Sequence, residues 1–142
     1  MRIMGLLKPD KDSEAGTPPS GELLGRMGSF IDEITKAGVM LSTDGLTPSA
    51  QGKRVRLTCG KVTVTDGPFT ETKELIASYA LFQVKTMDEA VRWTTRFLEV
   101  LGGGECELRP LFEPCDFGPE FTPELREAED RQRAGMAVNR QA

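Results

Sequence analysis

The residues best suited to chemistry gather in residues 66–75, which read Asp-Gly-Pro-Phe-Thr-Glu-Thr-Lys-Glu-Leu. Within this segment, Glu71, Lys73 and Glu74 place two carboxylates beside an ammonium group. Such a group can bind a polar ligand, and a buried carboxylate there can hold a proton near neutral pH and act as a general acid or base. A run of charges is equally typical of a solvated surface. The segment therefore predicts either a ligand site, which would include Asp66, or a charged outer face.

The start of the same segment has a purely structural interpretation. The Asp66 carboxylate can close a turn onto its own backbone, Gly67 can adopt a positive φ, and Pro68 fixes the direction of the chain. Phe69 is then expected to insert into the core. The predicted structural motif, a turn that shapes a strand exit, comprises Asp66, Gly67, Pro68 and Phe69.

Further polar side chains are candidates because of the elements that carry them. Tyr79 and Arg109 lie on predicted strands and can point into a barrel-like cavity between two subunits, which makes them candidate ligand contacts. A basic cluster can meet a phosphate or a carboxylate, or it can form the charged outer face of a hairpin. This cluster comprises Lys53, Arg54, Arg56 and Lys61.

The composition excludes several kinds of chemistry. The chain of 142 residues has no histidine, which removes the commonest zinc and iron ligand, the usual base near neutral pH, and the Ser-His and Cys-His nucleophiles. No set of carboxylates is spaced for an oxygen-only metal site, so we expect no metal and no cofactor. Any acid–base chemistry must come from carboxylate, lysine, tyrosine or cysteine side chains.

The charge and the cysteines bear on partners and location. A formal net charge of −4 argues against nucleic-acid binding, which needs a basic surface. No apolar run approaches the roughly 18–20 residues that cross a bilayer, so we expect no membrane association. Cys59, Cys106 and Cys115 are odd in number and lack C-x-x-C spacing, which suits a reducing compartment. These features predict a cytoplasmic protein.

Two segments have the apolar spacing of a helix that packs on a sheet. The first follows Ser20, a predicted N-cap, and ends at Gly38. The second follows Thr86, which forms a capping box with Glu89, and ends at residues 102–104. Its apolar stripe consists of Ala90, Val91, Thr94, Phe97, Leu98 and Leu101.

Strand patterns flank each helix. The four predicted strands are residues 2–8, 39–42, 75–84 and 105–112. Residues 54–58 and 61–65 alternate around a Cys-Gly turn, which predicts an antiparallel hairpin between the two halves. The order β-α-β twice, with an inserted hairpin, predicts an α+β, ferredoxin-like fold.

The chain is expected to divide into an α+β domain, residues 1–114, and a C-terminal extension, residues 115–142. Thr122 and Pro123 open a short charged helix in the extension. Three apolar side chains can dock the extension on the domain or on a second subunit; they are Phe117, Phe121 and Leu125.

Residues 66–75 resemble the signature of the DGPF branch of the YCII-related family, in which Asp-Gly-Pro-Phe is followed by a small residue and Glu-Thr/Ser-Lys-Glu. Further similar segments are residues 11–16, 37–39, 44–46 and 121–127. The resemblance implies a dimeric α+β barrel, in which two ferredoxin-like sheets pack face to face.

The resemblance implies little about activity. Relatives on the broader fold include muconolactone isomerase-like proteins, and the founding branch has a proposed His-Asp site that a chain without histidine cannot share. Thr47 stands where the family pattern often has histidine. DGPF-type proteins are also often associated with alternative sigma factors.

Three functional hypotheses from different classes follow. The first is a dimeric domain that binds a small polar metabolite. The second is a cofactor-free lyase or isomerase acting on a lactone-like acid through Asp66, Glu71 or Tyr79. The third is a regulatory module linked to alternative sigma factors. The predicted partner in each case is a second copy of the chain, because Leu81, Phe82 and Val84 suggest an apolar sheet face that helices do not cover.

Overall fold

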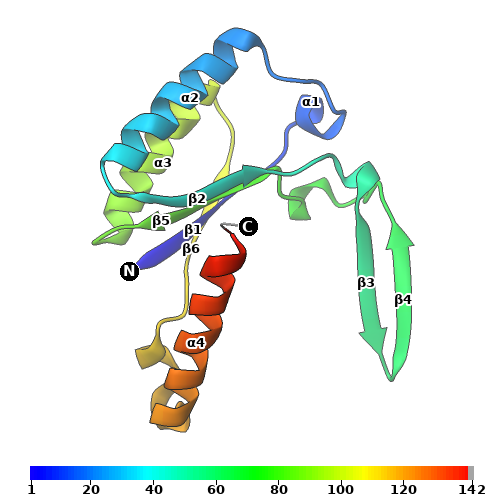
Figure 1. Ribbon diagram of the computed structural model, residues 1–142. Coiled ribbons are helices and arrows are strands. Elements are labelled where there is room, and N and C mark those ends of the chain that lie inside the picture. Colours follow the sequence, from blue (N-terminus) through cyan, green and yellow to red (C-terminus); the bar gives the residue numbers. More distant parts are fainter. Residues whose placement is uncertain (141–142) are drawn as a thin grey trace. The chain divides into compact units, whose positions relative to one another are not determined.

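The computed structural model describes residues 1–140, and the chain forms two compact units, Met1–Pro110 and Leu111–Ala142. The strands of the main sheet are β1 (Arg2–Leu7), β2 (Met40–Gly45), β5 (Ser78–Gln83) and β6 (Cys106–Pro110). They pair antiparallel in the order β2-β5-β1-β6 (Figure 1). The long helices α2 (Gly21–Lys36) and α3 (Met87–Leu101) cover one face of this sheet, and the short helix α1 (Lys11–Glu14) precedes them. The predicted α+β, ferredoxin-like fold is confirmed.

Both long helices begin and end where the local sequence predicts. The Ser20 hydroxyl accepts a hydrogen bond from the Leu23 N–H at 3.2 Å, and the Thr86 hydroxyl accepts one from the Glu89 N–H at 3.1 Å. Helix α3 ends at Gly102, whose φ of 84° is a conformation that glycine adopts without a steric penalty. These caps fix the helix registers and therefore which residues face the sheet.

The core lies between the two helices and the sheet. Ile3 on the inner strand β1 and Ile34 on α2 are fully buried. Ile3 pairs with Phe82 on β5, which contributes to the same core. The remaining buried members of this cluster are Phe30, Val39, Val84 and Ala90. Because strand residues alternate between faces, this register fixes the residues on the opposite side of the sheet.

The face of the sheet opposite α2 and α3, called here the open sheet face, carries Met4 and Leu6 from β1 and Tyr79 and Leu81 from β5. The prediction that Phe82 and Val84 belong to this face is wrong. Both are buried in the core, because alternation places them on the helix side once Leu81 is on the other. The open face is therefore less apolar than predicted.

Strand β5 starts later than its sequence pattern predicts, and strand β2 has an irregular register. Residues 72–74 form a 3₁₀ turn, so β5 starts at Ser78 and not at residue 75. Leu75 is nevertheless buried, which explains its strand-like apolar pattern. On the outer strand β2, the pairing with β5 shifts between Met40 and Ser42, where a β-bulge interrupts the register.

The predicted hairpin is present as a separate two-stranded sheet, β3 (Lys53–Thr58) and β4 (Lys61–Asp66). Thr58 pairs with Lys61, so the connecting turn is the predicted Cys59-Gly60. Both turn residues have positive φ, 50° and 76°, as the tight turns that match strand twist require.

The second unit consists of a 3₁₀ segment (Pro114–Glu120) and helix α4 (Pro123–Asn139). The predicted N-cap is present, since the Thr122 hydroxyl accepts a hydrogen bond from the Leu125 N–H. Helix α4 is much longer than the short helix expected. The rings of Phe112, Phe117 and Phe121 stack in sequence with centroids 5.2 and 5.1 Å apart. Across residues 1–140, no helix combines the length and apolar character needed to cross a membrane.

Candidate ligand-binding pocket

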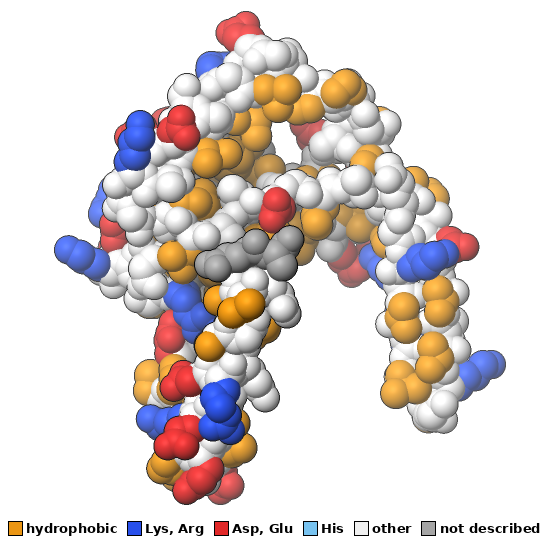
Figure 2. Space-filling model, viewed as in Figure 1, with side chains coloured by type: hydrophobic (Ala, Val, Ile, Leu, Met, Phe, Trp, Pro, Cys, Tyr) orange, Lys and Arg blue, Asp and Glu red, His pale blue; other side chains and the backbone are white. Residues whose placement is uncertain are grey.

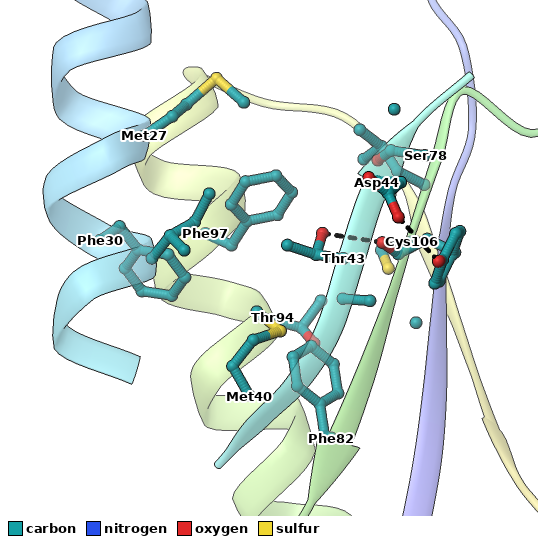
Figure 3. Close-up of a pocket in the computed structure, with 16 residues that line it drawn as sticks. Met27, Phe30, Met40, Thr43, Asp44, Ser78, Phe82, Thr94, Phe97 and Cys106 are labelled. Carbon is teal, nitrogen blue, oxygen red and sulfur yellow. Dashed lines mark hydrogen bonds between the residues drawn. The ribbon is translucent and has the colours of Figure 1, made fainter. Parts of the chain in front are cut away.

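A pocket of about 300 Å³ lies between the helix layer and the sheet of the first unit. Helices α2 and α3 form one wall, and strands β1, β2, β5 and β6 form the other (Figure 3). In the space-filling view, apolar side chains line the hollow between α2 and β2 (Figure 2). The volume is at the small end of the range typical of ligand sites.

The lining is mostly apolar and includes several aromatic and thioether side chains. Phe30 on α2 and Phe97 on α3 stack with ring centroids 5.9 Å apart, and Phe82 faces them from β5 (Figure 3). Met27 and Met40 fill the space around these rings. Methionine adapts to irregular shapes and packs well against rings, so this wall can accept a flat apolar molecule.

Thr94 is the most informative polar residue in the pocket. It lies on α3, its residue is only 6% exposed, and its hydroxyl has no hydrogen-bond partner within the described chain. A buried hydroxyl without a partner costs roughly 1–3 kcal/mol, and such groups are rare in folded proteins. The wall of the pocket therefore contains an unused hydrogen-bonding group, which a ligand reaches when the Thr94 side chain rotates toward the cavity.

The other polar groups of the pocket differ in their bonding. The Thr43 hydroxyl donates to the backbone carbonyl of Tyr79 at 2.8 Å, so its hydrogen is already committed. Cys106 on β6 is half-buried, and burial raises the pKa of its thiol. Because the neutral form is favoured, this thiol is a weak hydrogen-bond donor and a poor nucleophile at neutral pH.

An acidic residue lies at the rim of the pocket. The Tyr79 hydroxyl donates to Asp44 Oδ2 at 2.9 Å, and these residues are opposite each other on β5 and β2. Alternation places both side chains on the open sheet face, whereas their neighbours Thr43 and Ala80 face the cavity. Tyr79, a predicted ligand contact, thus borders the pocket, but its hydroxyl is on the opposite side of the sheet from the cavity.

The described lining contains no lysine and no arginine. A carboxylate or phosphate buried in this cavity would therefore have no cation to offset the cost of leaving water. The electrostatic character of the pocket, with the Asp44 carboxylate at its rim, therefore disfavours an anionic ligand.

Residues 66–75, called here the DGPF segment, lie outside the pocket and are organised around Ser49. The Ser49 backbone N–H donates to Glu14 Oε1 at 3.0 Å, and its hydroxyl also donates to that carboxylate. The same hydroxyl accepts a hydrogen bond from the Phe69 N–H at 3.1 Å. The Gly67 N–H donates to the carbonyl of Gly52 at 3.0 Å. Ser49 thereby joins α1, the 3₁₀ turn at residues 49–51 and the DGPF segment.

Three predictions about this segment are wrong in detail. Gly67 does not have a positive φ. A glycine is required at this position because the Cβ of any other residue would lie 1.7 Å from the carbonyl oxygen of Ser49. The Asp66 carboxylate forms an ion pair with Lys53 and not a turn onto its own backbone. Phe69 is only half-buried and lies outside the core cluster, with the Arg54 guanidinium 4.1 Å from its ring centre.

The charged candidates of the segment lie in solvent. Arg54 approaches Glu71 at 3.7 Å and Glu74 at 4.0 Å, and both carboxylates are more than half exposed. Lys73 is also exposed. Arg109 is 70% exposed and pairs with Glu107 at 3.7 Å on the open sheet face. None of these four candidates lines the pocket.

Thr94, Thr43 and Cys106 are pocket residues that no sequence motif predicts. One signal was available, because Thr94 occupies a position in the apolar stripe of the second helix. A hydroxyl on an apolar stripe indicates either an internal hydrogen bond or a cavity. The spacing alone does not distinguish these two cases.

Comparison with known proteins assigns the chain to a family. Residues 1–113 match the sequence profile of the YCII-related domain, and the chain belongs to this family. An uncharacterised protein of Rhizobium meliloti (strain 1021), R00369, is 31% identical over 80 residues, which are 56% of this chain. The match spans 64% of the length of that relative.

A solved structure also resembles the chain. It is 5-chloro-2-hydroxyhydroquinone dehydrochlorinase from Burkholderia phenoliruptrix AC1100, in complex with 2,5-dihydroxybenzoquinone. The TM-score is 0.44 at 10% sequence identity, over 80% of this chain and 95% of the other.

Proposed function

We propose that the protein binds a small, uncharged and largely apolar molecule in the pocket between its helices and its sheet. The observation that carries this proposal is the unpaired hydroxyl of Thr94, a residue only 6% exposed, in the wall of a largely apolar cavity of about 300 Å³. A ligand with one hydrogen-bonding group would satisfy that hydroxyl and bury its apolar surface against Phe30, Phe82 and Phe97.

The expected ligand differs from the polar metabolite expected from sequence. The charged side chains predicted to contact it, Glu71, Lys73 and Glu74, are exposed and outside the cavity. The cavity is lined instead by hydroxyl, thiol, aromatic and aliphatic groups, with the Asp44 carboxylate at its rim. Specificity would come from shape and from the single contact to Thr94.

We also propose that the chain works as a homodimer. An antiparallel sheet with helices on one face leaves its other face to solvent or to a partner. Here that face carries Met4, Leu6 and Leu81 at its centre. A second sheet packed about 10 Å away would cover them. A protein that sediments only as a monomer at micromolar concentration would contradict this proposal.

The alternative of a cofactor-free lyase or isomerase has weaker support. Asp66 and Glu71, two of its three proposed residues, lie outside the pocket, and the third, Tyr79, directs its hydroxyl to Asp44. The raised pKa of the Cys106 thiol removes it as a base near neutral pH. Binding is therefore the function that these side chains support best. The proposed link to alternative sigma factors has no counterpart in the pocket.

Titration with a matched pair of ligands tests the binding proposal. 2-Naphthol and 2-naphthoate share one ring system and differ in charge. We expect 2-naphthol to shift the amide NMR signals of Thr43, Thr94 and Phe97, and 2-naphthoate to bind at least tenfold more weakly. Loss of one hydrogen bond of about 1 kcal/mol in Thr94→Val should raise the Kd for 2-naphthol roughly fivefold.

A neighbouring residue provides the control for this titration. The Thr95 hydroxyl is exposed and donates to the Val91 carbonyl at 2.8 Å, so Thr95→Val should leave the Kd unchanged. Equal binding of the two naphthalenes, or shifts confined to residues outside the pocket, would contradict the proposed site.

A further inference from the structure

The β3–β4 hairpin has an apolar face that this chain's main sheet does not cover. Four aliphatic side chains on it are more than half exposed: Val55 at 71%, Leu57 at 69%, Val62 at 60% and Val64 at 55%. Val55 is opposite Val64 and Leu57 is opposite Val62, so the four form a compact two-by-two array. Figure 2 shows these apolar side chains grouped on the projecting hairpin. They are called here the hairpin array.

The other face of the hairpin is polar and anchored at its base. It carries Arg54 and Arg56 opposite Thr65 and Thr63. Arg54 lies over the Phe69 ring and approaches Glu71, which ties the base of the hairpin to the DGPF segment. The two hairpin strands pair only with each other among the described strands. A two-stranded hairpin is marginally stable in water by itself, so its apolar face needs a surface to pack on.

The position of the hairpin indicates what that surface is. In Figure 1 the hairpin extends beyond the sheet on the side away from α2 and α3, which is the side of the open sheet face. A molecule that packs on the open sheet face can therefore reach the hairpin as well. A second copy of the chain brings an equivalent hairpin to the first by twofold symmetry, so each hairpin can pack on the other subunit.

The contact area supports the same conclusion. A stable dimer buries about 800 Å² on each subunit. Met4, Leu6 and Leu81 are each already partly covered, so the centre of the open sheet face supplies only part of this area. The hairpin array adds roughly 400 Å², at about 100 Å² for each aliphatic side chain. The hairpin array thus supplies about half of the area that a specific interface buries on each subunit.

We infer that the hairpin is a dimerisation arm, whose array of Val55, Leu57, Val62 and Val64 packs on the second copy that covers the open sheet face. This inference rests on the proposed homodimer and deepens it. It assigns to the hairpin a role in assembly and not in ligand binding, since its residues do not line the pocket.

The exposed thiol at the hairpin tip allows a direct test. With Cys106 and Cys115 replaced by serine, a maleimide-benzophenone is attached to Cys59, and unlabelled and ¹⁵N-labelled copies are mixed before irradiation. We expect mixed-isotope crosslinks from the hairpin tip to residues 1–110 of the other copy. If sedimentation shows a dimer but the crosslinks stay within one chain, the hairpin is not the arm, although the dimer proposal survives. A monomer in sedimentation ends both proposals.

A matched pair of substitutions provides a second measurement on the full chain. Leu57→Lys puts a charge into the array, and Thr63→Lys puts the same charge on the polar face. We expect Leu57→Lys to raise the dimer Kd at least tenfold and Thr63→Lys to leave it unchanged, with circular dichroism verifying the fold of each. Equal dimer Kd values for the two variants would overturn the inference.

Discussion

Replacing Thr94 by valine should make the unliganded protein more stable. Threonine and valine have the same shape and nearly equal helix propensity, so the substitution in α3 changes one group only. The lost hydroxyl has no partner in the described chain, and its burial costs roughly 1–3 kcal/mol. We expect a gain of about 1 kcal/mol in the free energy of unfolding, which raises the Tm of a domain of this size by about 3 °C.

Thermal unfolding followed by circular dichroism measures this gain, with Thr95→Val as the control. The Thr95 hydroxyl is exposed, so its loss should change the free energy of unfolding by less than about 0.5 kcal/mol. Saturating 2-naphthol should stabilise the wild type more than Thr94→Val, because only the wild type offers the hydroxyl. The reasoning is refuted if Thr94→Val is about 1 kcal/mol less stable than the wild type while Thr95→Val is unaffected. In that case the Thr94 hydroxyl must have a hydrogen-bond partner.

Two further predictions follow from the loop and the thiol. Gly67→Ala should lower the free energy of unfolding, measured by urea titration, by about 3 kcal/mol, because the new Cβ would meet the Ser49 carbonyl oxygen. As a control, Gly28→Ala on an open helix surface should leave the free energy of unfolding unchanged or raise it slightly. Iodoacetamide should modify Cys106 more slowly than the exposed Cys59, and its rate should rise with pH to a midpoint above the ordinary thiol value, as burial requires. Equal rates at neutral pH would show that the Cys106 thiol is not buried in solution.

The features predicted correctly are those whose cause lies within a few residues. Ser20 and Thr86 cap their helices through the N–H of a residue three positions ahead, which a sequence pattern specifies completely. The hairpin turn at Cys59-Gly60 is equally local. The order of these elements was sufficient to predict the ferredoxin-like topology.

The errors concern residues whose role depends on distant parts of the chain. Gly67 is required by Ser49, which lies eighteen positions earlier and contacts it only after the chain folds. Asp66 has a local option, but Lys53 on the paired strand competes for the same carboxylate. Thr94 becomes notable only when α2 and the sheet close a cavity around it. No local periodicity contains that information.

The two outer strands of the main sheet also limit how the protein can associate. The bulge between Met40 and Ser42 breaks the regular row of hydrogen-bonding groups on β2, and β6 ends in Pro110, which has no N–H to offer. Both edges therefore resist the addition of a strand from another molecule. Open-ended growth of one sheet through many copies, the route to fibrils, is disfavoured even though the chain exposes apolar residues. Self-association is therefore directed to the faces of the chain, where a closed assembly with a fixed number of copies can form.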